Sequence, residues 1–505
     1  MKPAISKIVT AFLILLITNT GFASTGDKTF VQLWKDIDLL IEKSLPKSAM
    51  EVLDIVHDKA IIEKNDTQLL KSVIFRFKLF EMTEENHLEV SINYAKSQFD
   101  LLQSPSKQWL HSILAELYVF YYQQHRYEWL SRTNLVNNDS DDLNEWDLGK
   151  LQSVIQSHYE QSVKDIESLQ NRHLSAYIEI LENTEKESIN KQPTAYDFLV
   201  QRLIAYYLSP DAGVQKPAAG ITFSEPKAWS EGAVFVKLHF TDSENPQVNA
   251  LHWIQQLMLF HINDKNPDAY FQCDLQRLEL VRNLTQKQDD TDLKYLNALE
   301  SLQQSYNKQA ISTEAAALRA RFLLDQNYNA ESIQDSVLRW NTSKALVVCE
   351  NAITQFPESR GTKSCMILKQ EILEKSMQLS VQNVELPNKP IALLLGYKNI
   401  TNVSFRLIKT THTELDSILN IDNQETRKEA FLHLKANQNW QAGIPFEADY
   451  HNHSTILNLP ALETGLYILL ASADKDFEAG SVIAFTNFQV SLSSWNARFN
   501  RIFVY

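Results

Sequence analysis

Three cysteines are the residues of this chain best suited to forming a covalent bond. Cys349 and Cys365 flank the boundary between two expected helices, the first of which ends near Phe356. In an oxidising compartment two such thiols can form a lasting disulfide, and the alternative is a pair of buried thiols. The spacing leaves both interpretations open. Cys273 has no partner left and is expected in a core.

Two histidines, His451 and His453, flank Asn452 and could lie on one face of a strand as metal ligands. Because a pair without a third ligand makes a weak site, a polar hairpin is the favoured interpretation. The sequence contains no H-E-x-x-H or G-x-S-x-G motif and no phosphate-binding glycine loop. No pair of carboxylates stands in an apolar context typical of acid–base catalysis. We therefore expect no catalytic residue, metal, cofactor or small-molecule substrate, and no enzyme.

The first 23 residues have the pattern of a secretory signal. Lys2 and Lys7 precede an apolar run over residues 8–17. The small residues Gly21 and Ala23 then predict a cleavage site between Ala23 and Ser24. A membrane-spanning helix is the alternative, but it needs roughly 20 apolar residues. We expect export to the periplasm or cell envelope. No cysteine is present near the signal for lipid attachment, so membrane association stays open.

The composition favours a mainly helical, acidic protein. The 505 residues include only 11 glycines, whereas turns between strands need glycine and helices are destabilised by it. The formal net charge is −14, from 48 Lys and Arg against 62 Asp and Glu. Because an acidic surface repels phosphate backbones, we expect no nucleic-acid partner. A chain of this length exceeds one core and predicts several domains.

Apolar residues at spacings of three and four predict antiparallel helix pairs in two blocks, residues 24–208 and 250–376. The pairs are similar to tetratricopeptide repeats, including a helix that ends before Pro357. Between the blocks, residues 209–249 are rich in proline and glycine and predict an irregular linker or insertion, in which only residues 233–240 resemble a strand. Aromatic residues of the helix predicted over 107–130 are expected in the core rather than in a binding groove.

From residue 377 to 494 the pattern changes to that of strands and predicts an antiparallel β-sandwich. Near its end Phe488 and Val490 alternate with Gln489 and Ser491, which predicts one buried and one polar face. The last residues form another apolar strand pattern. The expected fold class is therefore α+β and multidomain, with mainly helical pairs followed by the sandwich.

Two stretches of the β region, LPALETGLYILLAS and FTNFQVSLSS, resemble the first macroglobulin-type domain of bacterial alpha-2-macroglobulin family proteins. The stretch TAYDFLVQRLIAYYL is similar to a helix that closes the first helical block in that family, and we expect its Arg202 to make structural hydrogen bonds or ion pairs. The resemblance implies a macroglobulin-like domain over residues 377–494. It also implies that residues 495–505 open a following domain, so that the chain is the N-terminal piece of a longer protein.

The same resemblance implies inhibition of peptidases by entrapment, with proteases or envelope proteins as partners. Entrapment needs a bait segment and later domains, so this piece alone is not expected to trap a protease. The family's reactive thioester forms from Cys-x-Glu-Gln, and the nearest stretch here, residues 349–352, lacks the glutamine.

Two alternative functions remain. One is a freestanding scaffold that binds protein or glycan, which a row of exposed aromatic residues on the sandwich would favour, and the other is an unrecognised hydrolase.

Overall fold

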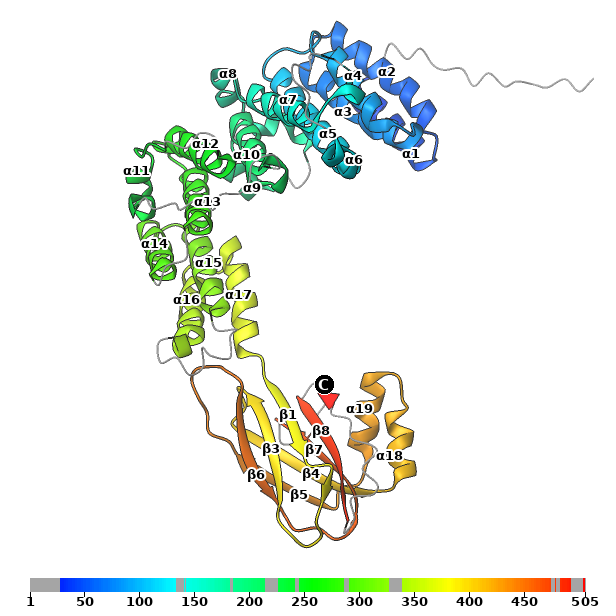
Figure 1. Cartoon of the computed structure of the whole chain (residues 1–505), viewed down its shortest axis with the longest axis vertical. Coiled ribbons are helices and arrows are strands. Elements are labelled where there is room, and N and C mark those ends of the chain that lie inside the picture. Colours follow the sequence, from blue (N-terminus) through cyan, green and yellow to red (C-terminus); the bar gives the residue numbers. More distant parts are fainter. Residues whose placement is uncertain are drawn as a thin grey trace, which may run out of the picture. The chain divides into compact units, whose positions relative to one another are not determined.

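The structure is a computed structural model that describes residues 28–132, 140, 142–181, 185–213, 226–240, 245–285, 290–326, 338–473, 477, 482–491 and 503–504. It confirms an α+β layout, because helices follow one another as far as Leu373 and the first strand begins at Ser376 (Figure 1). The chain divides into two compact units. Residues 1–228 and 232–286 form unit 1, and residues 229–231 and 287–505 form unit 2.

Unit 1 is built from helices that pack mainly against their neighbours along the chain. A capping box of Thr29 and Gln32 begins the first helix, and Ser44 and Lys64 have positive φ just after the first and second helices. The helices are α1 (Phe30–Glu42), α2 (Pro46–Ile62), α3 (Asp66–Thr83), α4 (His87–Gln98), α5 (Ser106–Gln124), α6 (Arg126–Ser131), α7 (Leu148–Gln161), α8 (Ile166–Gln170), α9 (Lys186–Lys191), α10 (Ala195–Leu208), α11 (Gly232–Phe235), α12 (Pro246–His261) and α13 (Asp268–Leu284).

The aromatic residues predicted to lie in the core of the region around α5 mostly do so. Trp109 stacks on Phe198 of α10 with ring centroids 4.7 Å apart, and Tyr118 is buried. Phe120 and Tyr127 differ, because 47% and 90% of their surfaces are exposed. The expectation was therefore wrong for these two residues.

Arg202 on α10 has the structural role expected of it. Its Nε donates to Ser112 Oγ at 2.7 Å, and its Nη2 donates to Glu116 Oε2 at 2.7 Å. These two contacts tie α10 to α5, and the second is an ion pair between half-buried side chains.

Residues 233–240, expected to resemble a strand, begin instead within α11 and continue as turns and irregular chain. The Phe235 ring is fully buried. The side-chain amide of Gln255 on α12 donates to the carbonyl oxygens of Phe235 and Leu238, at 2.9 Å in both cases. A side chain thereby satisfies carbonyl groups that a neighbouring strand would otherwise pair. The strand prediction was wrong because the backbone of this segment bonds locally, with the Val236 and Leu238 nitrogens donating to the Gly232 and Phe235 carbonyl oxygens at 3.0 Å.

A buried ion pair joins α10 to the end of α12. Asp197 accepts from His261 Nε2 at 2.5 Å and, through its other oxygen, from the Thr194 hydroxyl at 2.7 Å. His261 Nδ1 lies 2.7 Å from Asp264 Oδ2. Burial by itself would lower the pKa of His261, but the hydrogen bonds and charges of the two carboxylates raise that pKa above its ordinary value. The folded protein therefore favours the imidazolium form.

We expect His261→Gln to lower the free energy of unfolding by about 3–5 kcal/mol near pH 6, because Asp197 is left buried without a cation. A histidine with a raised pKa stabilises the fold below its unfolded pKa of about 6.5, and the contribution is lost as pH rises through the raised value. The difference between wild type and variant should therefore shrink towards alkaline pH in urea unfolding.

His252→Gln, on the same helix, is the control for this pH dependence. Burial lowers the pKa of His252, so this histidine is neutral in the folded protein at both neutral and alkaline pH. We expect the His252→Gln difference to be constant between neutral and alkaline pH. If the His261→Gln difference were equally constant there, the charged Asp197–His261 pair would be refuted.

Unit 2 begins with closely packed helices, α14 (Thr291–Ser305), α15 (Ser312–Asp325), α16 (Asn341–Gln355) and α17 (Arg360–Leu373). The helices α15, α16 and α17 pack against one another through a core rich in alanine. At Gly361 the backbone of α17 lies very close to that of α15, because a Cβ atom there would meet the carbonyl group of Thr313 and the backbone nitrogen of Glu314. Only a glycine fits at this point without moving α15 or α17.

Replacing this glycine should show how tightly the three helices pack. We expect Gly361→Ala to destabilise unit 2 by about 1–3 kcal/mol, because the added methyl group overpacks the contact with α15. This cost opposes the preference of helices for alanine over glycine, which is about 1 kcal/mol. Gly396→Ala is the matched control, since its Cβ would lie 3.6 Å from the Gln378 Cβ, an ordinary contact. Equal denaturation midpoints for the two variants would argue against the close approach.

The rest of unit 2 is a sandwich of two sheets, as the strand pattern predicts. The smaller sheet has the order β1-β3-β6, and the larger has the order β2-β8-β7-β4-β5 with β9 also on β8. Neighbouring strands are antiparallel except for β2 and β8, which are parallel. The strands are β1 (Ser376–Val381), β2 (Val384–Glu385), β3 (Ile391–Lys398), β4 (Asn402–Thr410), β5 (Gln438–Gly443), β6 (His453–Leu459), β7 (Gly465–Ser472), β8 (Ile483–Val490) and β9 (Phe503–Val504).

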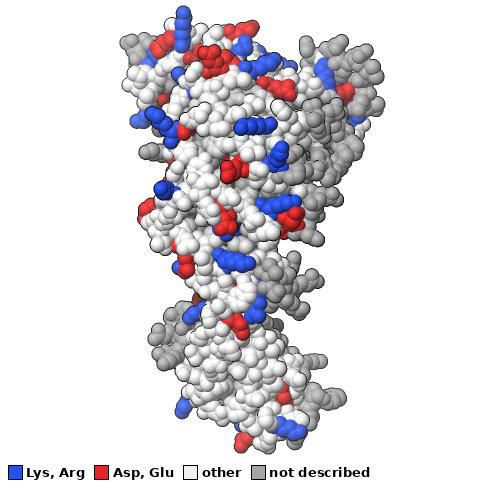
Figure 2. All heavy atoms as spheres, turned by 90° about the vertical axis from the view of Figure 1, so that its left-hand side faces the viewer, with Lys and Arg blue, Asp and Glu red and all other residues white. Residues whose placement is uncertain are grey.

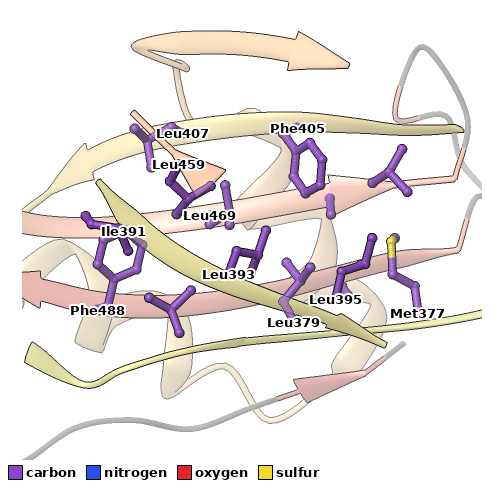
Figure 3. Packing of buried hydrophobic residues seen from close by; sticks show 14 of the residues in the cluster. Met377, Leu379, Ile391, Leu393, Leu395, Phe405, Leu407, Leu459, Leu469 and Phe488 are labelled. Carbon is purple, nitrogen blue, oxygen red and sulfur yellow. The ribbon is translucent and has the colours of Figure 1, made fainter. Parts of the chain in front are cut away.

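Apolar side chains of the two sheets meet in one core. Leu379 and Leu393 from the smaller sheet point towards Phe405, Leu469 and Phe488 from the larger (Figure 3). All five are at most 1% exposed. Because strand residues alternate between faces, the smaller sheet turns its other residues outward.

The sequence analysis missed two helices within the sandwich. α18 (His412–Leu419) and α19 (Gln424–His433) follow β4 and cover the outer side of the larger sheet (Figure 1). Phe431 of α19 packs on Phe485 of β8 with ring centroids 4.2 Å apart. Phe488 and Val490 are buried as expected, but the opposite face of β8 is not the polar surface that was expected, since Asn487 is 1% and Ser491 9% exposed. Strands covered on both faces have near-continuous apolar sequences, as residues 466–471 do.

The last described residues extend the larger sheet. Phe503 and Val504 pair with Phe485 and Ala484 of β8. They lie in the stretch 495–505 that was expected to open a further domain, and the structure instead places them in the sheet already formed. A following domain stays a prediction of the family resemblance.

Candidate functional site

The connection between the helices of unit 2 and the sandwich is fixed by hydrogen bonds to the end of α17. The Asn399 side chain donates to the carbonyl oxygens of Ile372 and Glu374, at 2.7 and 2.9 Å. Lys398 Nζ donates to the Glu371 carbonyl oxygen at 3.1 Å. The four C-terminal carbonyls of a helix lack partners within it, so the turn after β3 satisfies groups that α17 leaves open.

A second set of contacts holds the loop before β6 against the start of α16. Arg339 donates from Nε to Asp449 Oδ2 at 2.8 Å and from Nη2 to Glu447 Oε2 at 3.0 Å. The Ser343 hydroxyl donates to the Ala448 carbonyl oxygen. Asp449 is fully buried. We call Arg339, Glu447, Asp449, His451 and His453 the junction cluster.

The charge of Asp449 is stabilised by several donors at once. Burial alone would raise its pKa, but hydrogen bonds from His453, from the His451 backbone and from Arg339 together lower the pKa below its ordinary value. Asp449 Oδ1 lies 2.8 Å from His453 Nε2 and 3.2 Å from the His451 backbone nitrogen. The carboxylate is therefore ionised, and its role is to hold the two parts of unit 2 together.

The two histidines considered as metal ligands take part in this cluster. His451 Nε2 lies 3.0 Å from the Arg339 carbonyl oxygen, whereas His453 Nε2 contacts Asp449. Their ring nitrogens thus serve different partners rather than one common centre. Within the described ranges, no group of three or more His, Cys, Asp or Glu residues could hold a metal ion. Sequence reasoning found the histidines but missed Arg339 and Asp449.

The cysteines are all buried in the structure, and all three carry free thiols. Cys273 lies in the core of unit 1, as expected, and burial raises its pKa. Cys349 on α16 and Cys365 on α17 are fully buried in one hydrophobic cluster. A disulfide between them stays a prediction. The cleavage site expected between Ala23 and Ser24 lies outside the described residues.

The smaller sheet carries the clearest candidate for a binding surface. Its outward residues between the strand ends, which we call the open face, are uncharged: Gln378, Ser380, Ala392, Leu394, Gly396, Ser454, Ile456 and Asn458; Lys398, at the end of β3 on the same side, donates to the Glu371 carbonyl oxygen. Leu394 and Ile456 are cross-strand partners, and 45% and 68% of their surfaces are exposed. Figure 2 shows few charged side chains over the sandwich on the side that carries β6. Among the described helices, none packs on this face as α18 and α19 do on the larger sheet.

The free edge of β6 adjoins the open face. This strand pairs with β3 on one side, and none of the strands that the structure describes pairs with its other side. Its sequence, HSTILNL, holds no lysine, glutamate, aspartate or proline. Proteins usually protect edge strands with such residues, because unpaired backbone groups attract another strand. An uncharged edge beside exposed Leu394 and Ile456 is thus suited to binding an extended polypeptide.

We expect Asp449→Asn to lower the Tm of unit 2 by several degrees, because the buried charge that Arg339 and His453 contact is removed. Glu371→Gln is the matched control. Its pair with Arg321 is about one-third exposed or more on both sides, and such surface pairs contribute little. Differential scanning calorimetry of both variants tests the difference. Equal Tm values for the two variants would show that the junction cluster does not stabilise unit 2.

No model of a known protein family matches this chain, and no curated protein matches its sequence. In the part of the chain that is described, no helix is both long and apolar enough to cross a membrane. The family resemblance of the sequence therefore stays a hypothesis.

Proposed function

We propose that this chain is a non-enzymatic exported protein of the cell envelope, the N-terminal region of an alpha-2-macroglobulin-like peptidase inhibitor. In this proposal the helices are tetratricopeptide-like pairs and the sandwich is of macroglobulin type. The support is the order of elements, in which stacked helices lead through α17 directly into β1. The buried titratable groups support the non-enzymatic part of the proposal. Asp197, His261 and Asp449 are buried, and their contacts hold neighbouring segments of the fold together.

Entrapment requires a bait segment and later domains, so the contribution of this region is binding. The observation that carries the proposal is the contrast between the outer faces of the two sheets. Helices α18 and α19 cover the larger sheet, whereas the open face leaves Leu394 and Ile456 in water beside the free edge of β6. Exposed apolar groups beside an unpaired strand are features of sites that add a strand from a partner.

The partner that fits this site is an extended, uncharged segment of a protease or another envelope protein. Its backbone would supply the hydrogen bonds that the edge of β6 lacks, and an apolar side chain would lie against Ile456. The charged residue on this side of β3, Lys398, donates to the Glu371 carbonyl oxygen, and the residues around Ile456 carry no charge for recognising an ionic ligand. The formal net charge of −14 also disfavours nucleic acid.

The alternative is a freestanding scaffold of helical repeats and a sandwich that binds protein or glycan. Glycan binding would be favoured by a row of exposed aromatic rings on the sandwich. Four large apolar residues are exposed on the described part of the sandwich: Leu386, Leu394, Phe446 and Ile456. Because Phe446 is the single aromatic residue among these four, they do not form an aromatic row. The protein-binding form of the alternative shares the open face with the first proposal, and the two differ in whether the chain belongs to a longer peptidase inhibitor.

We expect Ile456→Lys to weaken binding of extended peptides by roughly tenfold or more, because a charge at an edge strand blocks strand addition. Peptides selected from a random displayed library on the mature protein provide the ligands, and their affinities are measured in solution. Asn439→Lys on the exposed edge strand β5 is the matched control and should bind as wild type does. Selected peptides that bind both variants equally would refute the site.

A further inference from the structure

The pair of thiols in the core of α15, α16 and α17 has no part in the proposed function. Cys349 and Cys365 are both fully buried in this core, on helices that pack against each other. Their neighbours are mainly aliphatic, including Ala352 and Leu368. In such surroundings a thiol has few polar partners, and the two thiols share one buried cluster.

The close approach of the helices keeps the two thiols together. The turn between α16 and α17 is short, and the Thr362 hydroxyl donates to the Ala352 carbonyl oxygen at 3.2 Å across it. Gly361 brings the start of α17 against the backbone of α15. These contacts restrict sliding of α17 along α16, so Cys349 and Cys365 remain neighbours whenever this part of unit 2 is folded.

We infer that Cys349 and Cys365 form an intramolecular disulfide that locks α16 to α17 when a disulfide-bearing oxidant is present. Each thiol loses its proton and the sulfurs form one S–S bond, while two electrons and two protons reduce one disulfide of the oxidant to two thiols. One thiolate attacks the disulfide of the oxidant and forms a mixed disulfide, which the other thiolate then resolves.

The position of this bond gives it a mechanical consequence. α16 begins beside Arg339 and Ser343, which hold the loop before β6, and α17 leads into β1. A bond between the two helices would therefore fix both attachments of the sandwich to one support. Oxidation should stabilise the folded state mainly by restricting the unfolded chain between the two cysteines.

The test counts thiols in the full chain after treatment with oxidised glutathione. The protein is denatured, treated with a maleimide and weighed intact by mass spectrometry. We expect the oxidised protein to take up one label, on Cys273, and the protein reduced beforehand to take up three. In Cys273→Ser we expect oxidation to leave no thiol to label. Three labels after oxidation, or peptide mapping that joins Cys273 to either partner, would overturn the inference.

A second measurement separates pairing from mere burial. Tm is recorded with and without a reductant for the oxidised wild type, for Cys349→Ser and for Cys273→Ser. We expect the reductant to lower Tm by several degrees in wild type and in Cys273→Ser, and to leave Cys349→Ser unchanged. If the reductant has no effect on Tm in wild type despite a mapped disulfide, the bond does not lock the helices and that part of the inference fails.

Discussion

The larger sheet of the sandwich is apolar on both faces, and this constraint decides how the domain is built. Leu469 and Phe488 face the smaller sheet, whereas Ile468 and Phe485 face α18 and α19. Burying one such side chain contributes about 1.5–3 kcal/mol, so leaving either face in water would cost more than the typical net stability of a domain, about 5–15 kcal/mol. The smaller sheet has one strongly apolar face and requires only one covering layer. Its other face, with Ile456, can therefore remain open.

The buried carboxylate of Asp449 imposes a second constraint. An ionised carboxylate in a core is unfavourable unless donors surround it, and here the donors come from Arg339, from His453 and from the backbone of its own loop. Since Arg339 precedes α16, these bonds form only when the sandwich and the helices are correctly placed within unit 2. The same electrostatic requirement thus fixes both the loop before β6 and the support of the edge strand.

Periodic patterns in the sequence made the α+β layout and most element positions predictable. Such patterns are local, so they could not predict contacts between residues that are distant in the chain. The helices α18 and α19 were missed because strands were extended across residues 377–494, although Thr411 and Asn423 are good N-caps and the apolar run of β7 implies cover on both faces. Long-range contacts left no comparable signal. Arg339 and Asp449 are 110 positions apart, so only the folded chain brings the junction cluster together.

An edge strand binds a partner well only if it is ordered before the partner arrives. Ordering a loose segment on binding consumes part of the interaction energy, so a preformed edge loses less. In unit 2 this order comes from a chain of contacts: Gly361 permits α17 to lie close to α15, the end of α17 is held by Asn399, and Asp449 anchors the loop that leads into β6. If the edge of β6 binds a partner as proposed, the tight helical core contributes to that binding, because loosening the core would raise the entropic cost of ordering the edge.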